Sequence, residues 1–316
     1  MKMESIVHKN TWVIIVYYNG LEWIERCLKS FENSHFKDQI IVVDNHSPEK
    51  KGIELIKEQF PAVKHIELNE NIGFGRANNL GIEYAIERNA EYVFLLNQDA
   101  WLIENDCVER LVKVAERNQD FGIISPVHFN SEQTALDEGF GIYLSTSKNW
   151  QWASDTFFES KKEIYELPFV NAAAWLLNLK AFHKIGYFDP AFFMYGEDVD
   201  LVNRTLFHRF KIGFVPNASI VHARENRLKS INKASLSYSE KMQFYGQYLA
   251  LLKNVRWGLG KAFVKFQTLW LTHIIEQIAQ QSWKRSWQIL FIGFRMMGRL
   301  IQLYLSRQKY KRGFSK

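Results

Sequence analysis

Polar side chains follow four apolar segments in the first hundred residues, and they are the first candidates for a site with chemistry. Each segment runs into a short stretch that contains Asn or Asp, at residues 17–20, 44–47, 69–74 and 97–100. Such residues also make turns and helix caps, so one stretch alone carries little weight. Four stretches in succession indicate one polar edge that binds a ligand.

A second group of candidates consists of three acidic residues, Glu197, Asp198 and Asp200, which lie within four positions of the chain. A helix is predicted to begin near Glu197, and a carboxylate in the first turn of a helix lies near backbone N–H groups that favour its ionised form. Three carboxylates exceed what a helix N-terminus needs. Asp200 is the expected structural member, because Arg204 follows it by four residues and can form an ion pair with it.

The elements that must position these residues alternate between strand and helix. Strands are predicted at 13–16, 40–43, 63–68 and 92–96, and helices at 21–31, 53–60 and 75–88. Strands separated by helix-length segments indicate βαβ crossovers and a mostly parallel sheet. Ligands of open parallel sheets bind at the carboxyl ends of the strands, and the four polar stretches lie there.

The second half of the chain is less regular. The pattern predicts a strand at 123–129 with a hairpin before residue 147, a mobile loop at 149–166, a helix from Glu197 to about Arg209, and short strands at 212–215 and 218–221 that end at His222. From Lys233 the spacing is helical to near Lys309.

The composition is that of a globular protein with a sizeable core, since 47% of the 316 residues are hydrophobic and 23% are charged. This excludes a disordered or collagen-like chain. Cys27 and Cys107 are too few for a disulfide scaffold and favour a reducing compartment. No secretory signal is visible, and no stretch approaches the roughly 18 apolar residues of a spanning helix.

Charge is distributed unevenly along the chain. Residues 225–316 contain 17 Lys or Arg and 3 acidic residues, a net charge of +14, whereas the preceding residues carry −8. A basic region of this strength indicates a polyanionic partner, either nucleic acid or an anionic membrane face.

The sequence contains five motifs in a characteristic order. They read Val-Val-Asp-Asn-His-Ser at 42–47, Asn-Ile-Gly-Phe at 71–74 with Ala-Asn-Asn-Leu-Gly at 77–81, Leu-Leu-Asn-Gln-Asp at 95–99, Phe-Met-Tyr-Gly-Glu-Asp-Val-Asp-Leu at 193–201, and Val-Pro at 215–216 with His222. In this order and spacing the chain resembles the inverting family-2 glycosyltransferases. Within that family it is similar to rhamnosyltransferase-like enzymes of bacterial surface-polysaccharide and O-antigen synthesis. The resemblance covers roughly residues 12–222.

The resemblance implies an α/β protein of the GT-A fold with a mostly parallel central sheet. The catalytic domain is expected at 1–224, with a nucleotide-binding half at about 11–100 and an acceptor half at about 101–224. A basic amphipathic helical region is expected at 225–316. The implied reaction moves a sugar, with inversion, from a nucleotide diphosphate donor to a hydroxyl of a glycan or lipid-linked acceptor. The favoured donor is dTDP-rhamnose, and a UDP-sugar is the other candidate.

The resemblance also assigns roles to individual residues. Asp99 and His222 would bind a divalent cation, Mg²⁺ or Mn²⁺. The family's Asp-X-Asp motif reads Asn-Gln-Asp here, so Asn97 offers only a weak carbonyl ligand or a contact to the sugar. Asp198 would be the general base, because an inverting displacement needs a carboxylate opposite the leaving group. Glu197 would bind acceptor hydroxyls.

The nucleotide is expected in a pocket at the strand ends. Asp44 would accept a hydrogen bond from the nucleobase, which suits the ring N–H of uracil or thymine. The pocket would be completed by Tyr17, Tyr18, Asn19, Asn71, Gly73 and Arg76. Arg76 would contact a phosphate or the base, and Gly73 would let the backbone turn.

The basic C-terminal region has a predicted helix that is apolar over most of its circumference. Trp283, Trp287, Phe291, Phe294 and Ile301 recur at helical spacing beside a narrow polar stripe. Such a helix packs on a partner helix, on a membrane interface or in a homodimer contact. A helical subdomain that packs on the catalytic body is the equal alternative. With the lipid-linked acceptors of the family, a cytoplasmic protein at the inner face of a bacterial plasma membrane is expected.

Other functions remain as alternatives. A nucleotidyltransferase of related fold would need an early Gly-rich phosphate loop with a basic residue, and residues 17–21 offer only Gly20. A non-catalytic sugar-nucleotide-binding subunit is favoured only by Asn97 and opposed by the Glu197–Asp198 pair. No nucleic-acid partner is expected, because the chain lacks an aromatic-basic RNA-binding motif and a helix-turn-helix signature.

Overall fold

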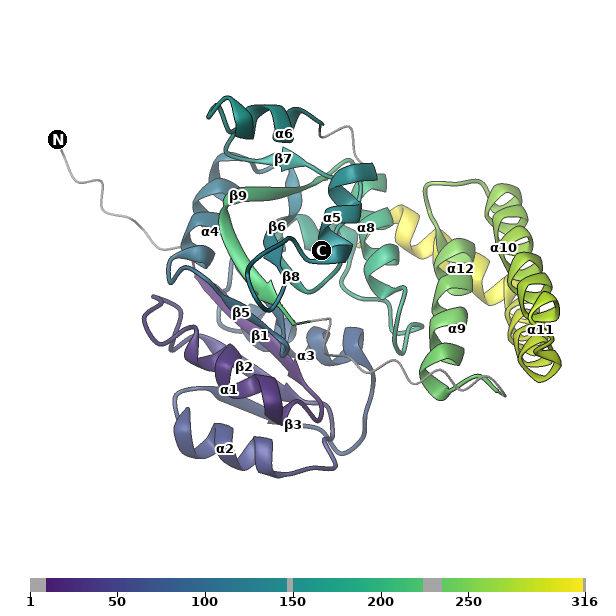
Figure 1. Ribbon diagram of the computed structural model, residues 1–316, viewed down its shortest axis with the longest axis horizontal. Helices are drawn as coiled ribbons and strands as arrows, with labels where there is room; N and C mark the ends of the chain where they lie inside the picture. Colours follow the sequence, from purple (N-terminus) through teal and green to yellow (C-terminus); the bar gives the residue numbers. More distant parts are fainter. Residues whose placement is uncertain (1–9, 147–149, 224–234, 315–316) are drawn as a thin grey trace. The chain divides into compact units, whose positions relative to one another are not determined.

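The computed structural model describes residues 10–146, 150–223 and 235–314 (Figure 1). These residues form two compact units that interleave along the chain. The first unit contains residues 10–72, 77–182 and 210–223, and the second contains residues 73–76, 183–209 and 235–314. The predicted domain boundary between residues 224 and 225 lies outside the described residues and stays a prediction.

The first unit is built on a mixed sheet, which has nine strands within the described residues. The strands are β1 (Thr11–Tyr17), β2 (Ile40–Asp44), β3 (Lys64–Glu67), β4 (Tyr92–Asn97), β5 (Ala100–Leu102), β6 (Phe121–Phe129), β7 (Tyr165–Glu166), β8 (Ala174–Asn178) and β9 (Lys211–His222). Their order across the sheet is β3-β2-β1-β4-β8-β6-β9-β5, with β7 paired to β9.

The four strands predicted in the first hundred residues form the parallel part of this sheet. β2 pairs with β1 and β3, and β1 pairs with β4, all in parallel. Tyr17 is the register partner of Asp44, and Val16 is the partner of Asn97. The polar stretches after these strands therefore start at one edge of the sheet. β6 and β9 are also parallel, whereas β8 runs antiparallel to both β4 and β6.

Helices accompany the sheet in the first unit. They are α1 (Leu21–Lys29), α2 (Lys51–Gln59), α4 (Cys107–Arg117), α5 (Glu138–Thr146) and α6 (Trp150–Phe157), and the residues of α3 (Phe74–Ile86) and α7 (Leu179–Ile185) are divided between the two units. The core contains Val13 and Val42 from the sheet, Leu28 from α1 and Leu111 from α4. Strands covered by helices are buried on both faces, which explains why their sequences read as continuous apolar runs.

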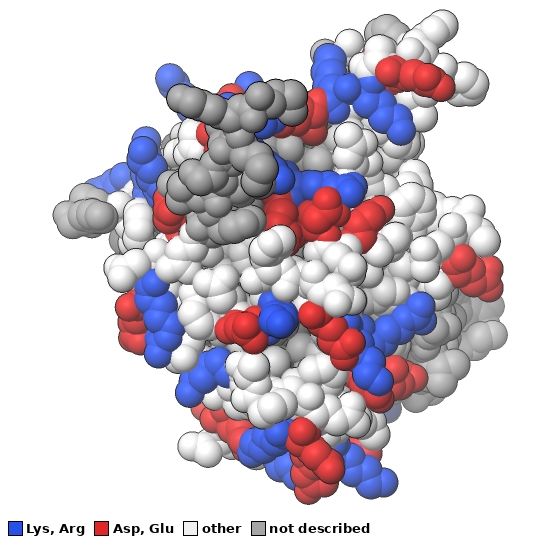
Figure 2. All heavy atoms as spheres, turned by 90° about the vertical axis from the view of Figure 1, so that its left-hand side faces the viewer, with Lys and Arg blue, Asp and Glu red and all other residues white. Residues whose placement is uncertain are grey.

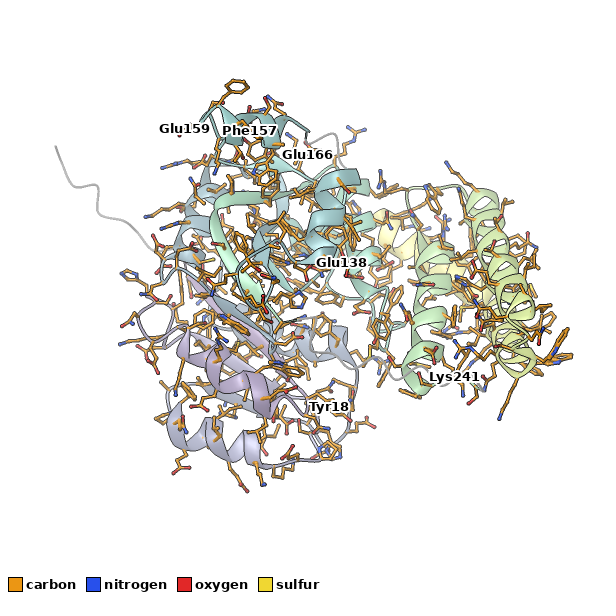
Figure 3. All side chains as sticks on the ribbon, in the orientation of Figure 1. Tyr18, Glu138, Phe157, Glu159, Glu166 and Lys241 are labelled. Carbon is orange, nitrogen blue, oxygen red and sulfur yellow. The ribbon has the colours of Figure 1, made fainter. Side chains whose placement is uncertain are left out.

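The region after β6 differs in part from the prediction. The strand expected at 123–129 is present, and the chain turns back after it so that Phe129 pairs antiparallel with Leu136, as the predicted hairpin requires. Helix α5, which was not predicted, follows this turn. Asp137 accepts a hydrogen bond from the backbone N–H of Phe140 (2.9 Å) and so caps this helix, while Phe140 and Leu144 bury one side of it. The predicted loop also contains a helix, α6. At its end Phe157 points away from the ribbon and is 88% exposed (Figure 3).

The last part of the sheet is more continuous than expected. The two short strands predicted at 212–215 and 218–221 are one strand, β9, whose pairing with β6 shifts register between Pro126 and Val127. The shift leaves residues 216–218 without register partners on β6 but does not end the strand, as in a β-bulge. The strand ends at His222, as predicted.

The second unit consists of α-helices. They are α8 (Glu197–Phe207), α9 (Tyr238–Lys253), α10 (Leu259–Ala279), α11 (Trp283–Met297) and α12 (Leu300–Arg312). The predicted helical character of the C-terminal region is therefore confirmed. Its core includes Phe192, Leu249, Phe266, Ile289 and Met296. Segment 183–209 shares this core, so α8 and the C-terminal helices belong to one packed unit.

Buried ion pairs hold α8 and α9 within this unit. Arg204 and Asp200 are both buried with Nε and Oδ2 2.8 Å apart, which confirms the predicted pair. Lys253 of α9 lies 2.5 Å from Oδ2 of Asp189. Burial alone would raise the pKa of the Asp189 carboxyl, but the ammonium group of Lys253 lowers it overall.

No single helix among the described residues is long and apolar enough to cross a membrane. α11 and α12 reach the required length and composition only together, and they are bent by 60° at the break between them.

Candidate active site

The end of β2 presents the carboxylate predicted to contact a nucleobase. Asp44 is fully buried, and its Oδ1 accepts a hydrogen bond from the backbone N–H of Ser47 (2.8 Å). Its Oδ2 makes no hydrogen bond within the described part of the chain and lies 3.7 Å from Nζ of Lys50. A buried carboxylate oxygen without a donor costs free energy unless a ligand supplies one. The geometry thus fits a carboxylate that receives a ring N–H.

Neighbouring loops of the first unit are tied to this strand end. The side chain of Asn45 donates to Oδ1 of Asn71 (3.0 Å) and accepts from the backbone N–H of Ile72 (2.9 Å). The backbone N–H of Asn19 donates to Oγ of Ser47 (3.1 Å). Asp44, Asn71 and Asn19 are therefore brought together, as predicted for pocket residues. Asn45 is the connecting residue, and sequence reasoning gave it no role of its own.

The chain after β1 is fixed to the chain after β4. Gln98 accepts a hydrogen bond from the backbone N–H of Tyr18 (2.8 Å) and donates one to the carbonyl oxygen of Tyr18 (3.0 Å). Tyr17 is buried, and this burial raises the pKa of its hydroxyl. Asn97 donates its backbone N–H to the carbonyl oxygen of Ala173 (2.8 Å). Gln98 thus holds Tyr18 beside Asn97 and Asp99.

Asp99 and His222, the predicted metal ligands, lie close together and are both buried. Oδ1 of Asp99 is 3.7 Å from Nε2 of His222. The pairing of β5 with β9 explains this proximity, because Ala100 is the register partner of His222. The backbone N–H of Ala223 also donates to the carbonyl oxygen of Asp99 (2.9 Å). Residues 123 positions apart are therefore held by a short β-ladder.

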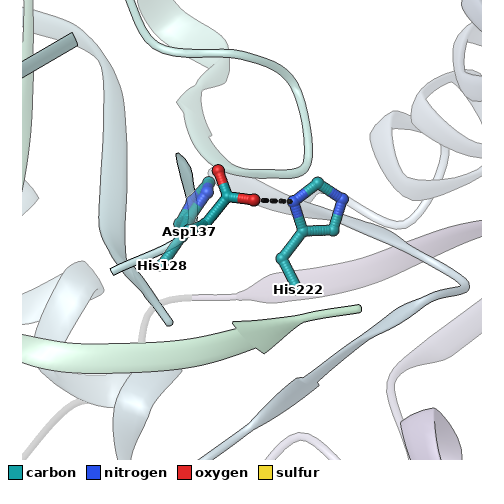
Figure 4. Close-up of side chains that lie close together, drawn as sticks. All are labelled: His128, Asp137 and His222. Carbon is teal, nitrogen blue, oxygen red and sulfur yellow. Dashed lines mark ion pairs between the residues drawn. The ribbon is translucent and has the colours of Figure 1, made fainter. Parts of the chain in front are cut away.

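Two further residues, Asp137 and His128, belong to the same cluster (Figure 4). Oδ2 of Asp137 lies 3.6 Å from Nδ1 of His222. Donor atoms of His128, Asp137 and His222 all lie within 4.8 Å of one another, and all three residues are buried. His128 is held by Ser125, whose Oγ lies 3.0 Å from Nε2.

Sequence reasoning missed Asp137 and His128, because the first lies in an irregular segment and the second inside a strand. The only sequence signal is the histidine near the end of β6, the strand that pairs with the strand of His222.

The donor set fits a divalent cation. Within the described residues, neither ring nitrogen of His222 makes a hydrogen bond, although both are buried. The carboxylate oxygens at 3.6 and 3.7 Å are too far for hydrogen bonds, yet they face the two nitrogens. Carboxylate oxygen and imidazole nitrogen are ligands that Mn²⁺ accepts, and Mg²⁺ prefers oxygen alone. Buried acidic groups beside an imidazole therefore form a site of the right chemistry for such a cation.

Glu197 and Asp198, the predicted catalytic pair, open helix α8 in the second unit. Gly196 is the N-cap and has a left-handed backbone, and Tyr195 before it also has a positive φ of 67°. Glu197 is buried, and this burial, followed by the charge of Asp198, raises its pKa to about 8. Asp198 is half-buried. Burial therefore favours the protonated form of Glu197, and in that form the carboxyl can donate a hydrogen bond.

Helix α9 contacts this turn closely at Gly246. A Cβ atom at Gly246 would overlap the carbonyl oxygen of Tyr195, and one at Gly196 would overlap the carbonyl oxygen of Gly246. The hydroxyl of Tyr195 also lies 2.9 Å from Oγ of Ser239, near the start of α9. The C-terminal helices therefore support the strained turn that precedes Glu197 and Asp198.

Gly73 and Arg76 lie in the second unit against segment 183–209. Gly73 has a φ of +89°, and a Cβ there would overlap the carbonyl oxygen of Phe193, so only glycine fits this turn. Arg76 donates from Nε and Nη2 to the carbonyl oxygen of Pro190 (3.0 and 2.8 Å). The turn at Gly73 was predicted. Contacts of Arg76 and Gly73 with a nucleotide stay predictions.

This sheet, its polar edge and the Asp/His cluster define a glycosyltransferase of the GT-A fold. The chain belongs to glycosyl transferase family 2, because the family's profile matches residues 12–186. It is 24% identical to the low-salt glycan biosynthesis hexosyltransferase Agl10 of Haloferax volcanii, over 79% of this chain and 78% of that protein. It is 23% identical to the rhamnosyltransferase WbbL of Escherichia coli, over 76% of this chain and 92% of that protein.

A solved structure shows the same fold. The mannosyltransferase PcManGT from Pyrobaculum calidifontis, in complex with GDP-Man and Mn²⁺, superposes with a TM-score of 0.57 at 15% identity. The match covers 93% of this chain and 88% of that one. The predicted family, fold and enzyme class are therefore confirmed, and the chain is similar to hexosyl- and rhamnosyltransferases.

Proposed function

We propose that this enzyme transfers a sugar from a nucleotide diphosphate to a hydroxyl of a glycan or lipid-linked acceptor, with inversion at the anomeric carbon. The observation that carries the proposal is the buried cluster of Asp99, His222 and Asp137, placed at the sheet edge where Asp44 offers an oxygen without a donor. A site for a nucleotide diphosphate needs a residue that recognises the base and a positive group, such as a bound cation, that neutralises the diphosphate. Similarity to a rhamnosyltransferase favours dTDP-rhamnose as donor, with UDP-sugars as the other candidates.

Asp99 and His222 are the residues proposed to hold the cation, with Nε2 of His222 as the nitrogen ligand. A bound cation would neutralise the negative charge that develops on the departing diphosphate. Asp137 faces the other ring nitrogen, Nδ1, and would keep the ring oriented toward Asp99. The similar mannosyltransferase contains Mn²⁺, and an imidazole ligand also favours Mn²⁺ over Mg²⁺ here.

Asp198 is proposed as the general base. Its carboxylate takes the proton of the acceptor hydroxyl while the acceptor oxygen bonds to the anomeric carbon. The bond from that carbon to the diphosphate oxygen breaks in the same step, and the nucleoside diphosphate leaves with the electron pair. Glu197, in the protonated form that its burial favours, would donate a hydrogen bond to an acceptor oxygen.

A nucleotide-release screen tests this function. Purified protein is incubated with dTDP- and UDP-sugars, with Mg²⁺ or Mn²⁺, and released dTDP or UDP is measured beside the thermal shift caused by each donor. We expect release with at least one donor and only with a divalent cation. Binding of a donor without release, even with candidate glycan acceptors, would favour the non-catalytic binding subunit instead.

A further inference from the structure

Helices α10, α11 and α12 each present a row of large apolar side chains to solvent. The rows are represented by Leu271 and Ile275 of α10, Trp287 and Phe291 of α11, and Ile301 and Leu305 of α12, which are exposed by 53 to 80%. Within each pair the residues are four positions apart, so they lie on one side of their helix. We call these six residues the outer apolar surface.

The outer apolar surface is separate from the residues that hold the unit together. The buried residues of α10 include Phe266 and Trp270, and those of α11 include Ile289 and Met296. Helical geometry places Leu271 and Ile275 on the side of α10 opposite Phe266 and Trp270. A helix that is apolar on both sides has a second partner, because exposed apolar rows of this extent mark an interaction site.

The C-terminal helices that carry the outer apolar surface have a positive net charge. Residues 235–314 contain thirteen Lys or Arg and only two acidic residues, and one of these, Glu240, pairs with Arg285 at 2.7 Å. Lys284 and Arg295 lie on α11 with Trp287 and Phe291 between them. By contrast, positive and negative side chains are interspersed on the face of the molecule in Figure 2. A partner that matches the outer apolar surface would therefore be both apolar and negatively charged.

We infer that the outer apolar surface docks on the anionic face of a lipid bilayer. Lipid offers acyl chains to the apolar rows and phosphate headgroups to the Lys and Arg residues, and tryptophan favours this interfacial depth. A second copy of the chain would instead bring two positive surfaces together, which charge repulsion opposes. The inference concerns location and holds whichever sugar the enzyme transfers.

The helices lie along the bilayer rather than across it. A span made of α11 and α12 would have to straighten their 60° bend. It would also remove Ile289, Met296 and Leu303 from the core that they share with Phe266. The two side-chain hydrogen bonds of Arg307 to carbonyl oxygens of Leu252 and Trp257, both 2.6 Å, would break as well. Interfacial docking keeps all of these contacts.

Vesicle co-sedimentation of the full chain tests the inference. The probes are vesicles of phosphatidylcholine alone and vesicles with about one third phosphatidylglycerol. We expect binding to the anionic vesicles at low salt and weak binding to the neutral ones. The double variant Trp287→Ser/Phe291→Ser should weaken anionic binding at least about tenfold. Lys284→Gln/Arg295→Gln should weaken it about fivefold for each charge removed.

Matched variants in the first unit serve as controls. Phe157→Ser/Phe158→Ser removes two aromatic side chains that are even more exposed, and Lys37→Gln/Lys113→Gln removes two exposed charges. Neither should change vesicle binding. Equal binding of all four variants, or loss of binding in the control variants alone, would overturn the inference. So would a stable dimer without lipid that Trp287→Ser/Phe291→Ser dissociates, because a second copy would then be the occupant.

Discussion

His222 lies with its Nδ1 3.6 Å from Oδ2 of Asp137, on the opposite side of the ring from Asp99. Imidazoles that bind metals are commonly oriented in this way by a carboxylate at the second nitrogen. Because Asp137 caps α5 through the N–H of Phe140, the orientation of His222 depends on a helix that is remote in sequence.

Replacing Asp137 with Asn should weaken Mn²⁺ binding by about 10- to 100-fold. The new side chain can still accept the hydrogen bond from the N–H of Phe140, but it no longer places a negative charge beside His222. Isothermal titration of Mn²⁺ measures this directly. Asp99→Asn should abolish binding, and Asp106→Asn, at an exposed pair with Arg110, should have no effect. If Asp137→Asn weakened Mn²⁺ binding more than Asp99→Asn did, the cation would instead lie between Asp137, His128 and His222.

Replacing Asp44 with Asn should weaken binding of UDP or dTDP at least about tenfold, because a hydrogen bond to a charged, buried oxygen is lost. The matched control is Glu67→Gln, at the register partner of Asp44 on β3, where the side chain is exposed. Fluorescence or calorimetric titration of both nucleotides checks the result. Equal affinities of the two variants would remove Asp44 from base recognition.

Replacing Gly246 with Ala should destabilise the protein by about 1–3 kcal/mol, because the new methyl group meets the carbonyl oxygen of Tyr195. Since this turn precedes Asp198, transfer activity should fall more than the remaining folded fraction explains. Gly260→Ala in α10 is the control, because nothing lies within 4 Å of its Cβ position and alanine favours helices. Urea unfolding measures the loss of stability, and activity at low temperature measures the loss of function in the folded protein. A Gly246→Ala variant with unchanged stability would contradict the close packing of α9 against this turn.

The pH dependence of folding should report the buried carboxyl of Glu197. Its pKa is about 8 in the folded protein, raised from 4.5 first by burial and then by Asp198. Between these values the folded chain holds a proton that the unfolded chain has lost, so the contribution of Glu197 to the free energy of unfolding falls as pH rises through this window. Urea unfolding at several pH values should show that the free energy of unfolding decreases less steeply with rising pH in Glu197→Gln than in the wild type. Identical slopes for both proteins would contradict a protonated Glu197.

Much of the fold was predictable because local pattern and tertiary structure agree in the first hundred residues. The buried strands there read as apolar runs, and the crossover helices between them fix the parallel order. Asp44, Asn71 and Asp99 could be predicted as candidate site residues because each lies at or shortly after the end of a strand, whereas His222 was predicted from the family resemblance. Their closeness within the first unit, Asp99 to His222 and Asp44 to Asn71 through Asn45, agrees with that prediction.

The remaining features depend on contacts between distant segments. No helix was predicted at 138–146, but the cap by Asp137 and the burial of Phe140 stabilise one there. Asp137 joins the cluster because its backbone N–H donates to the carbonyl oxygen of His128 (2.9 Å) across the antiparallel turn after β6. Pro216 suggests a break between two strands, but the register shift opposite Pro126 and Val127 keeps β9 continuous.

The general-base role of Asp198 is the central claim, and the variant Asp198→Asn tests it most directly. Transfer to an acceptor and binding of the donor nucleotide are measured on the same preparation, with Asp120→Asn, an exposed carboxylate paired with Lys211, as the control. We predict that Asp198→Asn lowers turnover by about 10²- to 10⁴-fold while the dissociation constant for the nucleotide stays unchanged. Turnover close to that of the wild type, at equal nucleotide affinity, would contradict the account.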